Sequence, residues 1–341
     1  MLYISCHSEA SLIHDNLCDN FKRNASIQLK VLCTEPNLPS FFDKVSQKLK
    51  LHNDSLSINK AILLELSQSR YDVVFICKGN NIRVSTLKKI RAQWPKCLLV
   101  SYSGDNMHKW HNKSLFYHFG MKYYQLIFSV NIPAYRKLEN LHTGSAKIIY
   151  LDKSYSSYLH RPLSRKRSSF KYNVIFIGTY EKERMDFMNF LAENGIQIDI
   201  FGGRWDRLKK KEIHKNLSIH YLELTGSAYV NAIFYSKITL GFLRKLNEDT
   251  QTSRSFEIPA CGGFMMMERT AEHLRLFVEG MEAEFFDSKE ELLEKIKYYL
   301  ANTKIREKIA LNGRRRCMKS PYSFQDRVTR ILYEMRNYRC H

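Results

Sequence analysis

Short apolar runs alternate with longer segments of helical periodicity along most of the chain. In the first half, runs rich in Val, Ile and Leu predict strands at residues 2–5, 27–32, 71–76, 97–102, 124–130 and 146–151. Between these strands, residues 57–70 and 84–94 carry apolar side chains at helical spacing. Strands that are apolar throughout are typical of a parallel sheet with helices on both faces, and we expect such a sheet here.

The alternation stops at residues 160–172, a basic, polar stretch that contains a proline. We interpret residues 161–171 as a linker between domains. Strands are predicted again in the second half, at residues 172–178, 197–203, 217–224, 238–243, 262–268 and 282–287. Residues 181–195 and 288–302 have helical periodicity, and the spacing of Ser288 and Glu291 predicts a capping box at the start of the second helix.

A chain of 341 residues is long enough for two domains of about 150–170 residues each. We predict an N-terminal domain over residues 1–160, the linker, a C-terminal domain over 172–320, and a helix within 321–341 that packs back on the N-terminal domain. The expected fold class is α/β, with two doubly wound, Rossmann-like domains that face each other across a cleft. Ligands of such sheets bind beyond the carboxyl ends of the strands.

The composition adds a formal net charge of +20, which favours an anionic partner: a nucleic acid, an anionic membrane surface or a phosphorylated substrate. A generally basic, soluble surface would give the same value. The eight cysteines contain no CxxC pair, so reduced cysteines and a cytoplasmic location are expected. We see no signal peptide and no apolar run that would span a bilayer. Peripheral attachment to the inner face of the cell membrane stays open, through basic stretches at residues 161–167 and 207–211.

Candidate anion-binding residues follow the first strand of the second half. Gly178, Thr179 and Tyr180 form a corner between a strand and a helix, where backbone N–H groups can approach a phosphate. Arg184, one turn into that helix, has the charge to neutralise a diphosphate. An ordinary turn between a strand and a helix is the alternative.

After the next strand, Gly202 begins a tight turn that leads to Trp205. This tryptophan either covers a planar base, walls the cleft or is simply packed in the interior. Further along, Lys245 and Arg254 are cations suited to a diphosphate, and Glu257 is suited to accept hydrogen bonds from a ribose diol. Two small residues, Gly262 and Gly263, would allow a ligand to approach closely. A solvated run of surface charges is the alternative for this stretch.

Residues 253–300 closely resemble the C-terminal domain of spore-maturation-protein-like (CgeB-like) glycosyltransferases of the GT-B fold. Residues 306–332 are similar to the closing helices of that family, and the resemblance as a whole runs from about 172 to 335. It implies a nucleotide-sugar donor bound by the C-terminal domain and a reaction without a metal ion or cofactor. Glu257 matches the second of two acidic positions, the one that binds the donor ribose. The first falls on Asp249, where relatives have Glu, and Lys245 and Arg254 resemble the diphosphate-binding cations.

The N-terminal half, on the acceptor side, offers candidate bases. Asp105 follows the strand at residues 97–102, where a carboxylate would face the cleft and take a proton from an acceptor hydroxyl. A helix cap or turn residue is the alternative for Asp105. His7, after the first strand, is a second candidate, and His108 a third. No spacing of His, Asp and Glu suggests a metal site.

The function predicted from the sequence is transfer of a sugar from a nucleoside-diphosphate sugar to a hydroxyl of a saccharide, glycolipid or cell-surface polymer, as in polysaccharide biosynthesis. One alternative is a basic nucleic-acid- or nucleotide-binding protein without enzymatic activity. No nucleic-acid-binding motif occurs, so no specific nucleic acid is expected as a partner. The other alternative is a sugar-nucleotide epimerase or hydrolase with the same fold.

Overall fold

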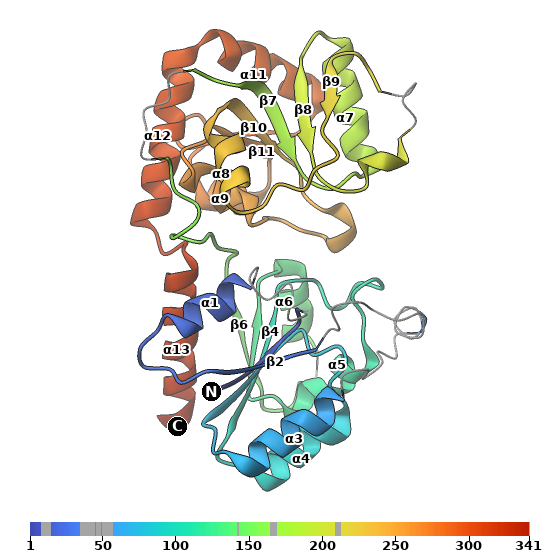
Figure 1. The fold of residues 1–341 in the computed structure, drawn as a ribbon, viewed down its shortest axis with the longest axis vertical. Helices are drawn as coiled ribbons and strands as arrows, with labels where there is room; N and C mark the ends of the chain where they lie inside the picture. Colours follow the sequence, from blue (N-terminus) through green and yellow to red (C-terminus); the bar gives the residue numbers. More distant parts are fainter. Residues whose placement is uncertain are drawn as a thin grey trace. The chain divides into compact units, whose positions relative to one another are not determined.

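The computed structural model describes residues 1–7, 15–34, 45, 49, 57–141, 143–163, 169–208 and 213–340, and it divides into two compact units (Figure 1). Unit 1 comprises Met1–Asp152, Lys245–Asp249 and Phe324–His341. Unit 2 comprises Lys153–Arg244 and Thr250–Ser323. The central part of the predicted linker and most of the basic stretch at residues 207–211 lie outside the described residues.

The sheet of unit 1 is parallel, with its strands in the order β2-β1-β3-β4-β5-β6. Its strands are β1 (Leu2–Ser5), β2 (Lys30–Cys33), β3 (Val73–Cys77), β4 (Leu98–Ser103), β5 (Leu126–Ser129) and β6 (Lys147–Tyr150). The predicted parallel sheet is confirmed, and β3 and β4 are buried almost throughout, as expected for strands covered on both faces.

Helices cover both faces of this sheet. One face packs against α3 (Ile58–Gln68), α4 (Val84–Gln93), α5 (Leu115–Gly120) and α6 (Ile132–Glu139). The other face packs against α1 (Asn16–Lys22) and the C-terminal helix α13 (Phe324–Cys340), which lie side by side in Figure 1. Val328, Ile331 and Met335 of α13 are buried against Phe75 and Phe128 of the sheet, so α13 is part of the core of unit 1.

Unit 2 contains a second parallel sheet, in the order β12-β11-β10-β7-β8-β9. Its strands are β7 (Tyr172–Ile177), β8 (Ile198–Phe201), β9 (Leu217–Ile219), β10 (Ser236–Gly241), β11 (Met265–Glu268) and β12 (Glu284–Phe286). Successive residues of β7 alternate between two cores: Val174 and Phe176 lie in one, and Ile175 and Ile177 in the other.

The two cores of unit 2 are completed by helices on opposite faces (Figure 1). The first contains residues of α7 (Lys182–Glu193), α11 (Lys289–Ala301) and α12 (Thr303–Lys319). The second contains residues of α8 (Gly226–Phe234), α9 (Arg254–Ala260) and α10 (Ala271–Leu276). The predicted strands are present, but some boundaries differ: β2 and β11 begin three residues later than predicted, and β9 ends at Ile219 and not at residue 224.

The predicted capping box at α11 forms in a modified way. The Ser288 side chain accepts a hydrogen bond from the Glu291 N–H at 3.1 Å, as the spacing predicts. The Glu291 carboxylate, however, accepts from the Asp287 N–H at 2.8 Å and pairs with Arg269. It therefore caps the residue before the N-cap.

The division into units differs from the predicted domain boundaries. Residues 153–160, the described ends of the predicted linker and residues 321–323 belong to unit 2. The segment Lys245–Asp249 belongs to unit 1, although the chain on both sides of it belongs to unit 2. Among the described residues, no helix combines the length and apolar character needed to cross a membrane.

Candidate functional site

The centre of unit 2 is the point where its strand order reverses. β7 leads outward to β8 on one side, whereas β10, its neighbour, leads to β11 on the other. In doubly wound sheets, the loops that diverge from two such strands leave a crevice at the carboxyl ends, where ligands bind. Here these loops begin at Gly178 and Phe242, directly after β7 and β10.

Arg184 joins the two loops at this point. From the first turn of α7, its guanidinium donates to the carbonyl oxygens of Thr179 at 2.8 Å and Leu243 at 3.3 Å. The side chain is buried, which lowers the pKa of Arg184, whereas Glu181 at 3.4 Å raises it. Arg184 therefore holds the strand ends in place with part of its guanidinium, while its buried Nε has no hydrogen-bond partner within the described part of the chain.

Two more arginines add positive charge to the same place. The charges of Arg254, at the start of α9, and of Arg244, after β10, both lower the pKa of Arg184. The buried Nε of Arg254 also has no partner among the residues described. Two carboxylates, of Glu181 and Glu268, partly balance the three positive charges. Glu268 already accepts a hydrogen bond from the Leu243 N–H. A local excess of cations with unused donors is suited to an anionic ligand such as a diphosphate.

Glu257 projects from α9, one turn after Arg254. Its carboxylate accepts a hydrogen bond from the Tyr229 hydroxyl at 2.8 Å, and His160 lies 4.0 Å away. The Glu257 side chain is 16% exposed, so a ligand can reach it. Unit 2 therefore brings the predicted ribose-binding carboxylate and a predicted diphosphate-binding cation onto one short helix.

The start of α9 is fixed by a buried serine and histidine. The Ser255 hydroxyl accepts from the Thr252 N–H at 3.1 Å and lies 2.8 Å from Nε2 of His273. The other ring nitrogen of His273 lies 2.7 Å from the carbonyl oxygen of Glu268, which can only accept. His273 therefore carries its proton on Nδ1, and Nε2 accepts from Ser255. Burial lowers the pKa of His273 to about 4.

The predicted glycine corner is a close contact between two loops. Gly202 has φ +142°, and a Cβ on it would lie 2.1 Å from the carbonyl oxygen of Gly178. The same carbonyl accepts a hydrogen bond from the indole of Trp205 at 2.8 Å. Trp205 is fully buried against Phe176 and Tyr180. Its burial favours the packed interpretation of this tryptophan over a surface that covers a base.

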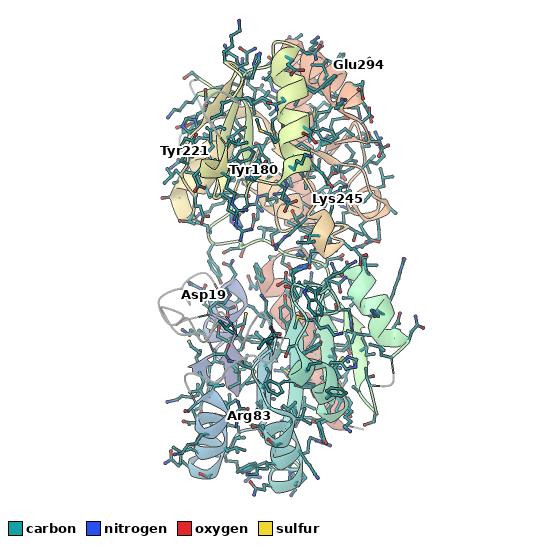
Figure 2. The ribbon with its side chains drawn as sticks, turned by 90° about the vertical axis from the view of Figure 1, so that its right-hand side faces the viewer. Asp19, Arg83, Tyr180, Tyr221, Lys245 and Glu294 are labelled. Carbon is teal, nitrogen blue, oxygen red and sulfur yellow. The ribbon has the colours of Figure 1, made fainter. Side chains whose placement is uncertain are left out.

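Tyr180 and Thr179 differ in how far they reach the surface. Thr179 is exposed at the corner, and Tyr180, labelled in Figure 2, is half-buried with its ring edge-on to Trp205. Gly262 and Gly263 are surrounded by the protein's own side chains. A Cβ on Gly263 would lie 2.5 Å from Ile233, and one on Gly262 would lie 3.2 Å from Pro162. These contacts favour a role in packing for both glycines.

Lys245 and Asp249 lie in the segment that belongs to unit 1. Lys245, also labelled in Figure 2, is exposed at the start of a 3-10 turn that ends at Asn247. The Asp249 carboxylate accepts hydrogen bonds from the side chains of Asn131 at 3.2 Å and Asn247 at 2.6 Å. Asp249 and Glu257, the two acidic positions of the predicted motif, are thus in different units.

The candidate bases of unit 1 follow strands that are separated in its sheet by β3. His7 follows β1, and Asp105 follows β4. Asp105 forms an ion pair of 2.9 Å with Lys78, which follows the intervening strand β3. Asp105 is not the helix cap, because the N-cap of α5 is Ser114, but it does lie in a bend after β4, as the turn alternative expects.

His108 lies in the same loop as Asp105 and is partly buried. Burial and the positive charge of Lys137 lower the pKa of His108 to about 4, and its buried Nε2 has no hydrogen-bond partner within the described ranges. The ring is therefore neutral at pH 7. Among the described residues, no three His, Cys, Asp or Glu side chains are grouped so that they could hold a metal ion.

Sequence reasoning did not identify Tyr229, His160 or Lys78 as part of the site. Tyr229 reads as an apolar position of a helix, and His160 as the end of the N-terminal domain. Their proximity to Glu257 comes from strand order and helix packing, which leave no local pattern in the sequence. Lys78 could have been found from its place directly after the buried strand β3, because ligands bind beyond the carboxyl ends of strands.

Comparisons with known proteins bear on the fold and on the family of the C-terminal half. Residues 184–333 match a family described as glycosyl transferase-like, and no curated protein matches the sequence significantly. Sucrose-phosphate synthase from Thermosynechococcus elongatus is 9% identical, with a TM-score of 0.71 over 98% of each chain.

Two ligand-bound structures share the architecture as well. HepE from Anabaena in complex with UDP is 10% identical, with a TM-score of 0.65 over 98% of this chain and 99% of that chain. UDP-GlcNAc 2-epimerase from Neisseria meningitidis bound to UDP-GlcNAc is 13% identical, with a TM-score of 0.56 over 98% and 99%. Identities this low establish the fold alone. The chain therefore has the two-domain α/β fold of GT-B glycosyltransferases, and residues 184–333 match the glycosyl transferase-like family.

Proposed function

We propose that this protein is a glycosyltransferase that moves a sugar from a nucleoside-diphosphate sugar to an acceptor hydroxyl. The observation that carries the proposal is the excess of arginine charge at the carboxyl ends of β7 and β10, one helical turn from the accessible Glu257. All of these groups are in unit 2, and most lie within the region that matches the glycosyl transferase-like family. The structural neighbour HepE, bound to UDP, supports the same ligand class.

In the proposed reaction the donor diphosphate is the leaving group, and it gathers negative charge in the transition state. Arg254 and Arg244 stabilise that charge, and Arg184 keeps the strand ends fixed while adding to the field. Glu257 accepts hydrogen bonds from the ribose diol. This chemistry needs no metal ion, and we propose a metal-independent mechanism. Lys245 and Asp249, held in unit 1, are assigned to the diphosphate and the donor sugar by their resemblance alone.

The proposed acceptor is a hydroxyl of a saccharide, glycolipid or cell-surface polymer. Asp105 is the proposed base, because it lies beyond the carboxyl end of β4, where ligands of open sheets bind. His7 and His108 are the alternatives. We also propose that the protein works in the cytoplasm, with an anionic membrane surface as a further partner, and that it belongs with the spore-maturation-protein-like enzymes.

Sugar transfer with a panel of radiolabelled UDP-, GDP- and ADP-sugars tests the proposal. We expect label to move from one of these donors to an acceptor from a glycan and glycolipid library. The Asp105→Asn variant should lower the turnover about 10²–10⁴-fold while donor affinity and melting temperature stay near wild type. Near-full turnover of this variant would exclude Asp105 as the base, and no transfer with any donor would contradict the proposed function.

A sugar-nucleotide epimerase or hydrolase is the second candidate, favoured by the shared fold of the UDP-GlcNAc 2-epimerase structure. Products formed from the donor alone separate the two, because an epimerase or hydrolase needs no acceptor. Retention of nucleic acid during purification, lost at high salt, would favour the binding protein that the net charge of +20 also allows.

A further inference from the structure

Two buried side chains from other parts of unit 2 lie beside Glu257, and we propose that Tyr229 and His160 are positioning residues for this carboxylate. The inference rests on the proposed role of Glu257 in binding the donor ribose. It adds that affinity for the ribose diol depends on the phenol of Tyr229 and the imidazole of His160, neither of which needs to touch the nucleotide.

Tyr229, on α8, fixes one oxygen of the carboxylate. Its hydroxyl donates to Oε2 of Glu257 at 2.8 Å, and the side chain is buried. Burial raises the pKa of Tyr229 well above 10, and the negative charge of Glu257 raises it further. The phenol therefore keeps its proton and always donates. Oε2 keeps one lone pair, and Oε1 accepts no hydrogen bond from Tyr229, so the carboxylate can still accept from a diol.

His160 faces the other oxygen. The Ser156 N–H donates to Nδ1 of His160 at 3.0 Å, so the neutral ring carries its proton on Nε2. Nε2 lies 4.0 Å from Oε1 of Glu257, too far for a direct hydrogen bond. The ring is buried and packs edge-on against Tyr229, with 5.8 Å between ring centroids. Burial lowers the pKa of His160, although the charge of Glu257 opposes this.

The hydrogen bond from Tyr229 thus restricts the Glu257 side chain before any ligand arrives, and His160 packs against the Tyr229 ring and faces the other oxygen. A carboxylate that rotated freely would have to be ordered during binding, which costs affinity. Because Tyr229 and His160 come from α8 and from the segment before β7, they also tie α9 to its neighbours. The test must therefore separate a loss of ligand positioning from a loss of stability.

Ligand chemistry provides that separation. Calorimetric titrations use whichever of UDP, GDP, ADP and CDP the wild type binds tightest, together with its 2′,3′-dideoxy form. Tyr229→Phe removes the hydroxyl and keeps the ring. We expect this variant to bind the diphosphate about fivefold more weakly and the dideoxy form within about twofold of wild type.

The chain offers a matched control in the same unit. The hydroxyl of Tyr299 donates to Oε1 of Glu284 at 2.6 Å, which is the same type of buried bond away from α9. Tyr299→Phe should leave both affinities unchanged. Equal losses for the two ligands in Tyr229→Phe, or an unchanged affinity for the diphosphate, would overturn the inference.

A second variant, His160→Asn, applies if Tyr229→Phe does not fold. The side-chain oxygen of the asparagine still accepts from the Ser156 N–H. The substitution removes the ring nitrogen that faces Glu257. We expect the affinity for the nucleoside diphosphate to fall about two- to threefold and the affinity for its dideoxy form to stay unchanged. If the wild type binds the diphosphate more tightly than its dideoxy form but both variants have wild-type affinities, only the inference on Tyr229 and His160 is overturned. If the wild type binds both forms equally, the ribose role of Glu257 is overturned as well. If the wild type binds none of the four nucleoside diphosphates, the proposed function is contradicted.

Discussion

Side chains around α9 differ in how much water they contact, and on this basis we propose Glu257 as a ligand-binding group and its buried neighbours as supporting ones. Glu257 retains 16% of its exposure, whereas Tyr229, His160 and His273 are buried behind it. A buried, neutral histidine is also a point of pH sensitivity, because its protonation must break an existing hydrogen bond.

His273 should make the folded state less stable in mild acid. Its pKa in the folded protein is about 4, below the ordinary value of 6.5, so the unfolded chain takes up a proton that the native state does not. The contribution of His273 is complete above pH 6.5 and is lost as the pH falls toward 4, at a slope of up to about 1.4 kcal/mol per pH unit. Urea unfolding at pH 7, 6, 5 and 4.5 measures this slope.

The contribution of His273 can be isolated with a suitable background. Trp205 is the only tryptophan of unit 2, so replacing Trp94 and Trp110 with Phe makes the fluorescence report on that unit. In this background, His273→Gln should reduce the loss of unfolding free energy between pH 6.5 and 4.5. A pH dependence identical to that of the parent would show that His273 is protonated equally in the folded and unfolded states.

At the scale of elements, the loops after β7 and β8 meet through glycine. Gly202 is in a backbone conformation that favours glycine, and its α-carbon faces the carbonyl of Gly178. Gly202→Ala would place a methyl group against backbone, which cannot rotate away. We expect the unfolding free energy of unit 2 to fall by at least about 2 kcal/mol. Urea unfolding monitored by Trp205 fluorescence measures this loss.

Gly195, after α7, is the matched control for this substitution. It also has a positive φ, of 85°, but a Cβ there would meet nothing within 4 Å. Gly195→Ala should cost about 1–2 kcal/mol, the penalty for the left-handed conformation alone. If both variants lose the same free energy, the contact between Gly202 and Gly178 does not constrain the loops.

Elements were largely predictable from the sequence because both sheets are parallel and buried on both faces. Their central strands contain apolar runs, such as Val73–Cys77, and this pattern is local. Positions within the site were less predictable. Asp105 could be placed at a strand end, but the burial of Trp205 and the bonds of Arg184 to two loops depend on contacts between distant segments.

The segment Lys245–Asp249 shows the same limit at a larger scale. Its assignment to unit 1 depends on the buried side chain of Asn247, which accepts hydrogen bonds from the Asn106 N–H at 3.1 Å and the Asn112 side chain at 3.0 Å. Asparagines in loops carry no periodic signal, so the sequence predicted one uninterrupted C-terminal domain.

For the whole molecule, the net charge of +20 and the fold are compatible with several anionic ligands, and we propose a diphosphate because of the arginines of unit 2. Solved structures of a synthase and of an epimerase share the fold. The central claim is therefore that unit 2 binds a nucleoside diphosphate through the cations at the ends of β7 and β10.

Calorimetric titration of the wild type and of Arg254→Ala with a nucleoside diphosphate and with the free nucleoside tests this claim most directly. Arg275→Ala, an exposed arginine of α10 paired with Glu272, serves as the control. We expect Arg254→Ala to weaken diphosphate binding at least about tenfold, as expected for lost hydrogen bonds between charged groups, while nucleoside binding and the control change little. Equal losses for both ligands, or no diphosphate binding by the wild type, would contradict this claim.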